Sequence, residues 1–185
     1  MLFESYYEGW VMLNTDYKIQ AIKVLLNEDC ILTRYYPLIP YKDLLIENLS
    51  KMGCYTKSDC MNLSDESLLD AGLTDIGMVH LFKAFLGLYD INSTKLKEIT
   101  TVCKNDEEIQ VFRELYQLPG VKSMRATLYF KAGFRSLADI AVSSPQEIIE
   151  KTENVIRQEN LGLKAPLLKE VKTHIAVARA FTDVL

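Results

Sequence analysis

Cysteine and histidine are scarce in this sequence, and their placement argues against several kinds of site. The four cysteines are scattered along the chain, and five residues separate the closest two, Cys54 and Cys60. A disulfide scaffold is denser in cysteine, and a structural zinc site usually shows two tight pairs of ligands. We therefore expect reduced, buried cysteines, no metal site and no cofactor.

Long apolar runs are also absent. No run approaches the roughly 20 residues that a membrane-spanning helix requires. The first ten residues carry Glu4 and Glu8 and no basic residue, unlike a secretory signal peptide. These features favour a cytoplasmic protein with no membrane partner.

Catalytic motifs are missing as well. The two histidines, His80 and His174, are far apart, and the sequence shows no clustered carboxylates, no phosphate-binding glycine loop and no nucleophile motif. His174 falls on the apolar face of a helical pattern, where a packed side chain is expected. We expect a protein that is not an enzyme.

The overall composition is typical of a globular protein, and the charge is distributed unevenly along the chain. Of 185 residues, 49% are apolar and 25% are charged, which is typical of a globular protein. The formal net charge is −4, but residues 1–92 hold 7 Lys/Arg against 13 Asp/Glu, and residues 93–185 hold 14 against 12. The two net charges, 7 − 13 = −6 and 14 − 12 = +2, suggest unlike partners or mutual attraction.

The chain repeats itself at a shift of 80 residues. Residues 53–70 align without a gap on residues 133–150, and Gly72-Leu73 recurs as Gly162-Leu163 once ten additional residues are allowed for. Most of the shared polar residues are typical of helix starts, including two Ser/Thr-x-x-Asp capping boxes. The matching residues are Gly53, Thr56, Asp59, Ser64 and Asp70 in the first copy and Gly133, Ser136, Asp139, Ser144 and Glu150 in the second.

This repetition predicts two related units in an all-α fold. Apolar residues recur at helical spacing nearly throughout, and convincing strand alternation is absent. We divide the chain into an acidic N-terminal half, residues 1–92, and a C-terminal half, residues 93–185, with a break near residues 91–105, where the periodicity weakens. Four N-terminal aromatic residues share a helical face that is either core or an exposed anchor for a partner: Phe3, Tyr6, Tyr7 and Trp10.

The stretch LPGVKSMRATLYFKAGF, residues 118–134, carries the clearest functional signal. A Pro-Gly pair between two apolar residues precedes a helical pattern, and the region from Arg113 to Arg135 holds five basic residues and one acid. Together with the RSLADIA that follows it, this stretch (residues 118–141) resembles the helix-hairpin-helix motif of DNA repair and recombination proteins. The paired arrangement is similar to an uncharacterised bacterial family of tandem helix-hairpin-helix units. In the first half, LSDESLLDAGLTDIGMVHLFKAFLGL (residues 63–88) also resembles the end of a sterile-alpha-motif (SAM) domain.

The resemblance covers about residues 35–90 and 115–182 and implies helix-hairpin-helix or SAM-like topology in both units. It also implies that the second hairpin holds a nucleic-acid backbone without reading its bases. A glycine lets another backbone approach, and free N–H groups at a helix start favour an anion. The predicted nucleic-acid-binding residues are Gly120, Val121, Lys122, Ser123 and Arg125.

The sequence departs from the family pattern in both hairpins. The family usually has a second glycine two residues after the first, and this position holds Lys122. In the first half the hairpin is Leu38–Tyr41, where Pro40 takes the glycine position and has no N–H to donate. We therefore expect a degenerate first hairpin that does not bind nucleic acid.

Two functions remain open from the sequence. The first is a non-enzymatic tandem helix-hairpin-helix module that contacts a nucleic-acid backbone non-specifically through residues 118–125. The second is a protein-interaction or self-associating scaffold module, including homo-oligomers, in which the hairpins only join helices.

Overall fold

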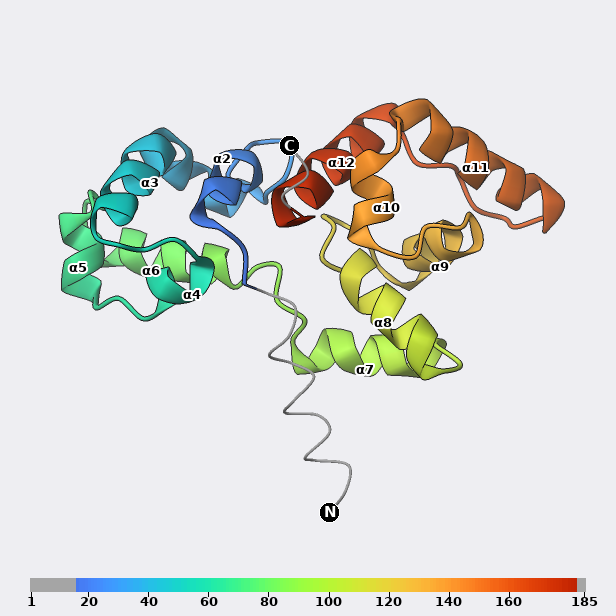
Figure 1. Cartoon of the computed structure of the whole chain (residues 1–185), viewed down its shortest axis with the longest axis horizontal. Helices are drawn as coiled ribbons and strands as arrows, with labels where there is room; N and C mark the ends of the chain where they lie inside the picture. Colours follow the sequence, from blue (N-terminus) through green and yellow to red (C-terminus); the bar gives the residue numbers. More distant parts are fainter. Residues whose placement is uncertain (1–15, 183–185) are drawn as a thin grey trace, which may run out of the picture. The chain divides into compact units, whose positions relative to one another are not determined.

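The computed structural model describes residues 16–182, and these residues form helices and no strand. The expected all-α fold class is therefore confirmed. The chain divides into two compact units, one ending at Asp90 and the other beginning at Ile91 (Figure 1). The aromatic residues Phe3, Tyr6, Tyr7 and Trp10 lie outside the described residues.

The N-terminal unit packs short helices around aromatic and leucine side chains. Tyr35 contacts Phe85 edge-on with ring centroids 6.0 Å apart, and Phe82 stacks on Phe85 at 6.3 Å. Full burial of one such side chain contributes roughly 1.5–3 kcal/mol to folding. The helices of this unit are η1 (Ile19–Ala21), α2 (Ile22–Leu25), η2 (Thr33–Tyr41), α3 (Lys42–Lys51), α4 (Lys57–Met61), α5 (Asp65–Asp70) and α6 (Ile76–Leu86).

The expected first hairpin is not a turn between two α-helices. Residues 38–41 form the end of the 3-10 helix η2, which contains Pro37 and Pro40 and continues directly into α3. Proline lacks the N–H that a hydrogen-bonded turn or a helix N-terminus would offer. This segment therefore presents no free helix start to a ligand.

The C-terminal unit is built from helices of 6 to 15 residues. In this unit α10 and α12 pack against each other, α12 also contacts α11, and α9 lies between α8 and α11 (Figure 1). Its helices are α7 (Ser93–Val102), α8 (Asp106–Leu115), α9 (Ser123–Lys131), α10 (Leu137–Val142), α11 (Pro145–Gln158) and α12 (Leu168–Thr182).

The stretch expected to separate the two units holds helix α7. Asn92 caps its N-terminus by accepting a hydrogen bond from the Lys95 N–H, and Leu96 and Ile99 are buried. Because α7 packs on α8 and α9, residues 93–102 belong to the C-terminal unit and are not a linker.

The predicted helix starts are confirmed in both units. Thr56 with Asp59 and Ser136 with Asp139 form complete capping boxes, in which each side chain satisfies a backbone N–H of the other residue. Ser64 and Ser144 cap α5 and α11 by a single contact each, in which the serine side chain accepts a hydrogen bond from the backbone N–H three residues later, and Pro145 stands at the start of α11. These contacts satisfy backbone N–H groups that a helix leaves unpaired at its start.

The repeat alignment pairs Gly53 with Gly133 and Gly72 with Gly162. The structure confirms the first pair as equivalent helix ends and contradicts the second. Gly53 and Gly133 have φ values of 81° and 93° and end α3 and α9. Gly72, at φ 113°, ends α5 by the same double hydrogen-bond pattern, but the corresponding residue after α11 is Asn160, at φ 50°. The predicted equivalence of Gly72-Leu73 with Gly162-Leu163 is therefore wrong for the helix end.

The helix order of the two units corresponds along the chain. The series η2, α3, α4, α5, α6 in the first unit parallels α8, α9, α10, α11, α12 in the second, with a 3-10 helix in place of α8. The additional residues expected around 151–160 appear as a longer helix, since α11 has 14 residues and α5 has 6. That the two units superpose with helix-hairpin-helix or SAM-like topology stays a prediction.

The structure also bears on the cysteines, on metal-binding clusters and on membrane-spanning helices. All four cysteines are free thiols, and Cys54 and Cys60 are buried. Within residues 16–182, no group of three or more His, Cys, Asp or Glu side chains is arranged to hold a metal ion. None of the described helices combines the length and apolarity needed to cross a membrane.

Candidate nucleic-acid interface

The 118–125 hairpin is a tight turn fixed by two buried apolar side chains. Leu118 and Val121 are 2% and 4% exposed, and the N–H of Val121 donates to the carbonyl of Leu118 at 3.2 Å. Gly120, between them, is exposed and has φ 73°, a conformation that other residues rarely adopt. A Cβ atom at this position would meet no heavy atom within 4 Å, so the space above the turn is open.

Helix α9 starts directly after this turn without a side-chain cap. Lys122 is the N-cap residue, and its side chain makes no capping hydrogen bond. By contrast, α10 and α11 in the same unit have serine caps that accept from a backbone N–H of the first turn. The first turn of α9 therefore offers backbone donors and the positive end of the helix dipole to a ligand.

A pocket of about 340 Å³ lies at this helix start. The hairpin contributes Gly120, Lys122, Met124 and Arg125 to its wall, and the segment before and within α12 contributes the rest. Three of its charged side chains are basic and one is acidic, so the lining carries a net positive charge. The residues from that segment are Leu163, Lys164 and Glu170.

Arg125 forms an internal ion pair within this pocket. Its Nε lies 2.9 Å from Oε1 of Glu170, and its Nη2 donates to Oε2 of the same carboxylate at 3.3 Å. Its Nη1 donates to the carbonyl of Lys164 at 3.1 Å. The guanidinium therefore ties α9 to the start of α12, and it is not a free cation in the ligand-free protein.

The buried side chain of His174 makes a hydrogen bond to the backbone of the hairpin. Its Nε2 lies 2.9 Å from the carbonyl oxygen of Pro119, and its Nδ1 lies 2.7 Å from the hydroxyl of Tyr129. Because a carbonyl oxygen can only accept, Nε2 carries the hydrogen and Nδ1 accepts from the tyrosine hydroxyl in the neutral imidazole. The expectation of a packed His174 is confirmed, since the residue is 1% exposed.

Burial is the main cause that lowers the pKa of His174 from its ordinary value. The Pro119 carbonyl and the carboxylate of Glu170 act to raise that pKa, and Arg125 lowers it. Burial also raises the pKa of Tyr129, and the charge of Glu170 adds to that rise. The imidazole and the phenol are therefore both neutral at neutral pH, which suits the hydrogen bonds that they make.

Ser123 and Val121 face inward and have structural contacts. Val121 is part of the core, and Ser123 is half-buried, with a side-chain hydrogen bond that acts to lower the pKa of Tyr116. The larger effects on Tyr116, burial first and then its hydrogen bond to Glu98, raise its pKa. Of the five predicted residues, Gly120 and Lys122 are the two that are exposed.

Most of the basic cluster predicted around the hairpin is engaged inside the unit. Arg113 is 2% exposed, Lys131 pairs with Glu159, and the guanidinium carbon of Arg135 lies 3.7 Å from the centroid of the Phe130 ring. With Arg125 paired as well, four of the five cations contact other parts of the protein. Local charge in the sequence therefore overstated the charge available to a ligand.

No local signal in the sequence predicts the second side of the pocket. Lys164 and Glu170 lie 39 and 45 residues after Arg125, in a segment that follows the longer helix α11. The additional residues of the second copy were visible as an insertion relative to the first, but their position beside the hairpin was not. The structure thus adds one exposed cation, Lys164, and one acid to the predicted site.

Comparison with known proteins finds a family match within the C-terminal unit. Residues 93–181 match a family described as a domain of unknown function, DUF4332. The match begins at the first residue of α7 and ends in α12, so it spans the helices that build the pocket. No solved structure matches the chain at a significant level.

Proposed function

We propose that the protein is a non-catalytic helical binding module whose C-terminal unit holds a nucleic-acid phosphate backbone at the 118–125 hairpin. The observation that carries the proposal is the open pocket at the uncapped start of α9. Gly120 leaves the backbone accessible there, and Lys122 and Lys164 stand at the pocket with exposed side chains.

The chemistry of this arrangement suits a phosphate group. The first-turn N–H groups of α9 supply hydrogen-bond donors that are already oriented, and the helix dipole favours a negative charge at the same point. Within the described residues, the ammonium groups of Lys122 and Lys164 make no ion pair, so both are available to neighbouring phosphates. The shallow, local footprint predicts contact with about two to four phosphates.

Such contacts position a strand and do not identify its bases. The pocket presents cations and backbone donors, which bind phosphate oxygens equally in every sequence. We therefore expect weak binding with little sequence preference and a strong dependence on salt.

The test is a fluorescence anisotropy titration of labelled single-stranded and duplex oligonucleotides at pH 7.5 and about 50 mM salt. Wild-type protein should bind, and log affinity against log salt should have a slope of roughly −2 to −4. Lys122→Ala and Lys164→Ala should each weaken every oligonucleotide alike and reduce that slope by about 1.

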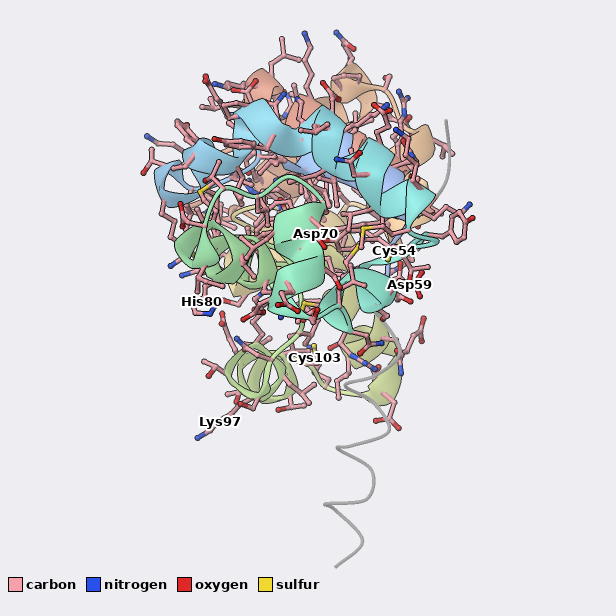
Figure 2. The ribbon with its side chains drawn as sticks, turned by 90° about the vertical axis from the view of Figure 1, so that its left-hand side faces the viewer. Cys54, Asp59, Asp70, His80, Lys97 and Cys103 are labelled. Atoms are coloured by element: carbon pink, nitrogen blue, oxygen red, sulfur yellow. The ribbon has the colours of Figure 1, made fainter. Side chains whose placement is uncertain are left out.

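The matched control is Lys97→Ala. Lys97 is an exposed lysine of α7 in the same unit, it is not part of the pocket, and its side chain projects away from the ribbon (Figure 2). This variant should bind as wild type does. A control that weakens binding as much as the two pocket variants would show that only overall charge matters and would remove the hairpin from the proposal.

A second function is favoured by a different observation. Met124, Leu167 and Leu168 are 67%, 74% and 45% exposed, and Met124 lines the pocket while the two leucines lie on the segment that borders it. Exposed apolar side chains of this kind are typical of protein-interaction surfaces. If neither wild-type protein nor any variant at the pocket binds an oligonucleotide, but wild type self-associates in sedimentation velocity, the scaffold function with homo-oligomers is the correct one.

A further inference from the structure

The ion pair between Arg125 and Glu170 places an anion inside the candidate phosphate site. The two oxygens of the Glu170 carboxylate face two guanidinium nitrogens of Arg125, with Nε 2.9 Å from Oε1 and Nη2 3.3 Å from Oε2. A phosphate binds arginine through the same paired geometry, with two oxygens facing two N–H groups. Both side chains line the pocket and are about one quarter exposed, at 22% and 31%, so the pair is reachable from it.

We infer that Glu170 sets the affinity of the hairpin site by occupying, in the ligand-free protein, the position on Arg125 that a backbone phosphate takes in the complex. This inference rests on the function proposed above. Binding then exchanges one anion for another on the guanidinium, so the arginine contributes little net affinity in the wild-type protein. Lys122 and Lys164, which have no such internal partner among the described residues, supply the net electrostatic gain.

The position of Glu170 allows its carboxylate to leave Arg125 when a phosphate binds there. The residue lies in the first turn of α12, and its carboxylate also accepts a long hydrogen bond from the Leu167 N–H, at 3.4 Å from Oε2. A carboxylate near a helix N-terminus stays favourable after it leaves the arginine, because the dipole of α12 still favours its charge. Arg125 keeps its hydrogen bond to the Lys164 carbonyl and so remains directed toward the pocket.

The inference predicts a gain of binding from a single neutralising substitution. Glu170→Gln preserves the side-chain volume and frees the charge of Arg125 for the ligand. One additional neutralised phosphate steepens the salt slope by about 0.9 for duplex and about 0.7 for single strands. Between about 200 and about 50 mM salt, a slope change of 0.9 raises the affinity of E170Q relative to wild type by about three- to fourfold, so E170Q should bind duplex at least several times more tightly than wild type at about 50 mM salt.

Two control variants separate this effect from a general change of charge. Glu147→Gln also removes one negative charge from an ion pair, with Lys151 on α11, but Glu147 is not part of the pocket. It should leave affinity and slope near those of wild type. The double variant Arg125→Ala/Glu170→Gln should lose the gain, because the freed guanidinium is its source.

The titration is done at pH 7.5, where His174 is neutral, with thermal melts of each variant to confirm folding. A gain in E170Q that is absent in E147Q and abolished by R125A supports the inference, whether wild type binds weakly or below detection. Wild-type binding with unchanged affinity in E170Q overturns the inference and leaves the proposed function standing. No binding by wild type or by E170Q rejects the proposed function and the inference together.

Discussion

At the residue scale, Gly120 carries the strictest conformational requirement of the hairpin. Its φ of 73° lies in the left-handed region, and no neighbouring atom crowds the position of a Cβ. The requirement is therefore one of backbone conformation and not of space. The buried side chains of Leu118 and Val121, before and after the glycine, anchor the turn in the core.

We predict that Gly120→Val destabilises the protein by about 1 kcal/mol or more, because a β-branched residue is strained at positive φ. Gly120→Asn should cost less, since asparagine tolerates this conformation. The measurement is the free energy of unfolding from denaturant titration of the wild type and both variants. A valine variant as stable as wild type would show that the turn does not depend on the glycine.

At the element scale, His174 joins three parts of the C-terminal unit. It belongs to α12, accepts from Tyr129 of α9 and donates to Pro119 of the hairpin. Arg125 and Glu170, which face the same region from α9 and α12, complete the charged and titratable groups around it. Protonation of the imidazole would place a hydrogen on Nδ1 and remove its ability to accept from the Tyr129 hydroxyl.

This contact predicts a loss of stability on mild acidification. The pKa of His174 is lowered in the folded state, so the unfolded chain binds more protons at low pH. The stabilising contribution is therefore present above the ordinary histidine pKa of about 6.5 and is lost as the pH falls toward the lower folded-state value. For one proton the change is at most about 1.4 kcal/mol per pH unit.

The prediction can be checked with denaturant unfolding at several pH values from 7.5 to 5.5. His174→Gln should flatten the pH dependence, because glutamine offers a donor and an acceptor but does not titrate in this range. His80→Gln, a substitution of the exposed histidine on α6 of the other unit, should retain it. A His174→Gln variant with the wild-type pH profile would mean that another group is responsible.

At the scale of the whole molecule, the net charge and the candidate pocket are distributed unevenly between the two units. The described part of the N-terminal unit ends at Asp90 and contains no uncapped hairpin equivalent, because η2 runs into α3. The half of the chain that carries the pocket is also the half with net positive charge. The family match to residues 93–181 covers that same unit.

We predict that residues 91–185 fold when produced alone and bind oligonucleotides at least as tightly as the full chain. The unit has its own buried core, and removal of the acidic half removes repulsion of the phosphate backbone. Circular dichroism should show a helical spectrum with a cooperative melt, and anisotropy should give the affinity. A fragment that melts without cooperativity would mean that the C-terminal unit depends on the rest of the chain.

The sequence by itself determined where several helices begin and where some of them end. The capping boxes at Thr56 and Ser136 and the glycine ends at Gly53 and Gly133 follow from contacts within five residues of each other along the chain. Such contacts depend only on neighbours in sequence, so the pattern of residues contains the information needed to predict them. The error at Gly162 arose because asparagine also adopts the left-handed conformation, which let Asn160 end α11 two residues earlier.

Only the tertiary structure decided which charges the hairpin presents. Arg125 is bound by Lys164 and Glu170, which lie 39 and 45 residues after it in the sequence. His174 lies 55 residues from its partner Pro119. Whether a cation is free or paired depends on which distant side chains the packing of α9 and α12 brings within about 4 Å, since attraction between charges depends on distance in space. A sum of charges along the sequence includes Arg125 among the cations available to a ligand, but in the folded protein Arg125 is paired with Glu170.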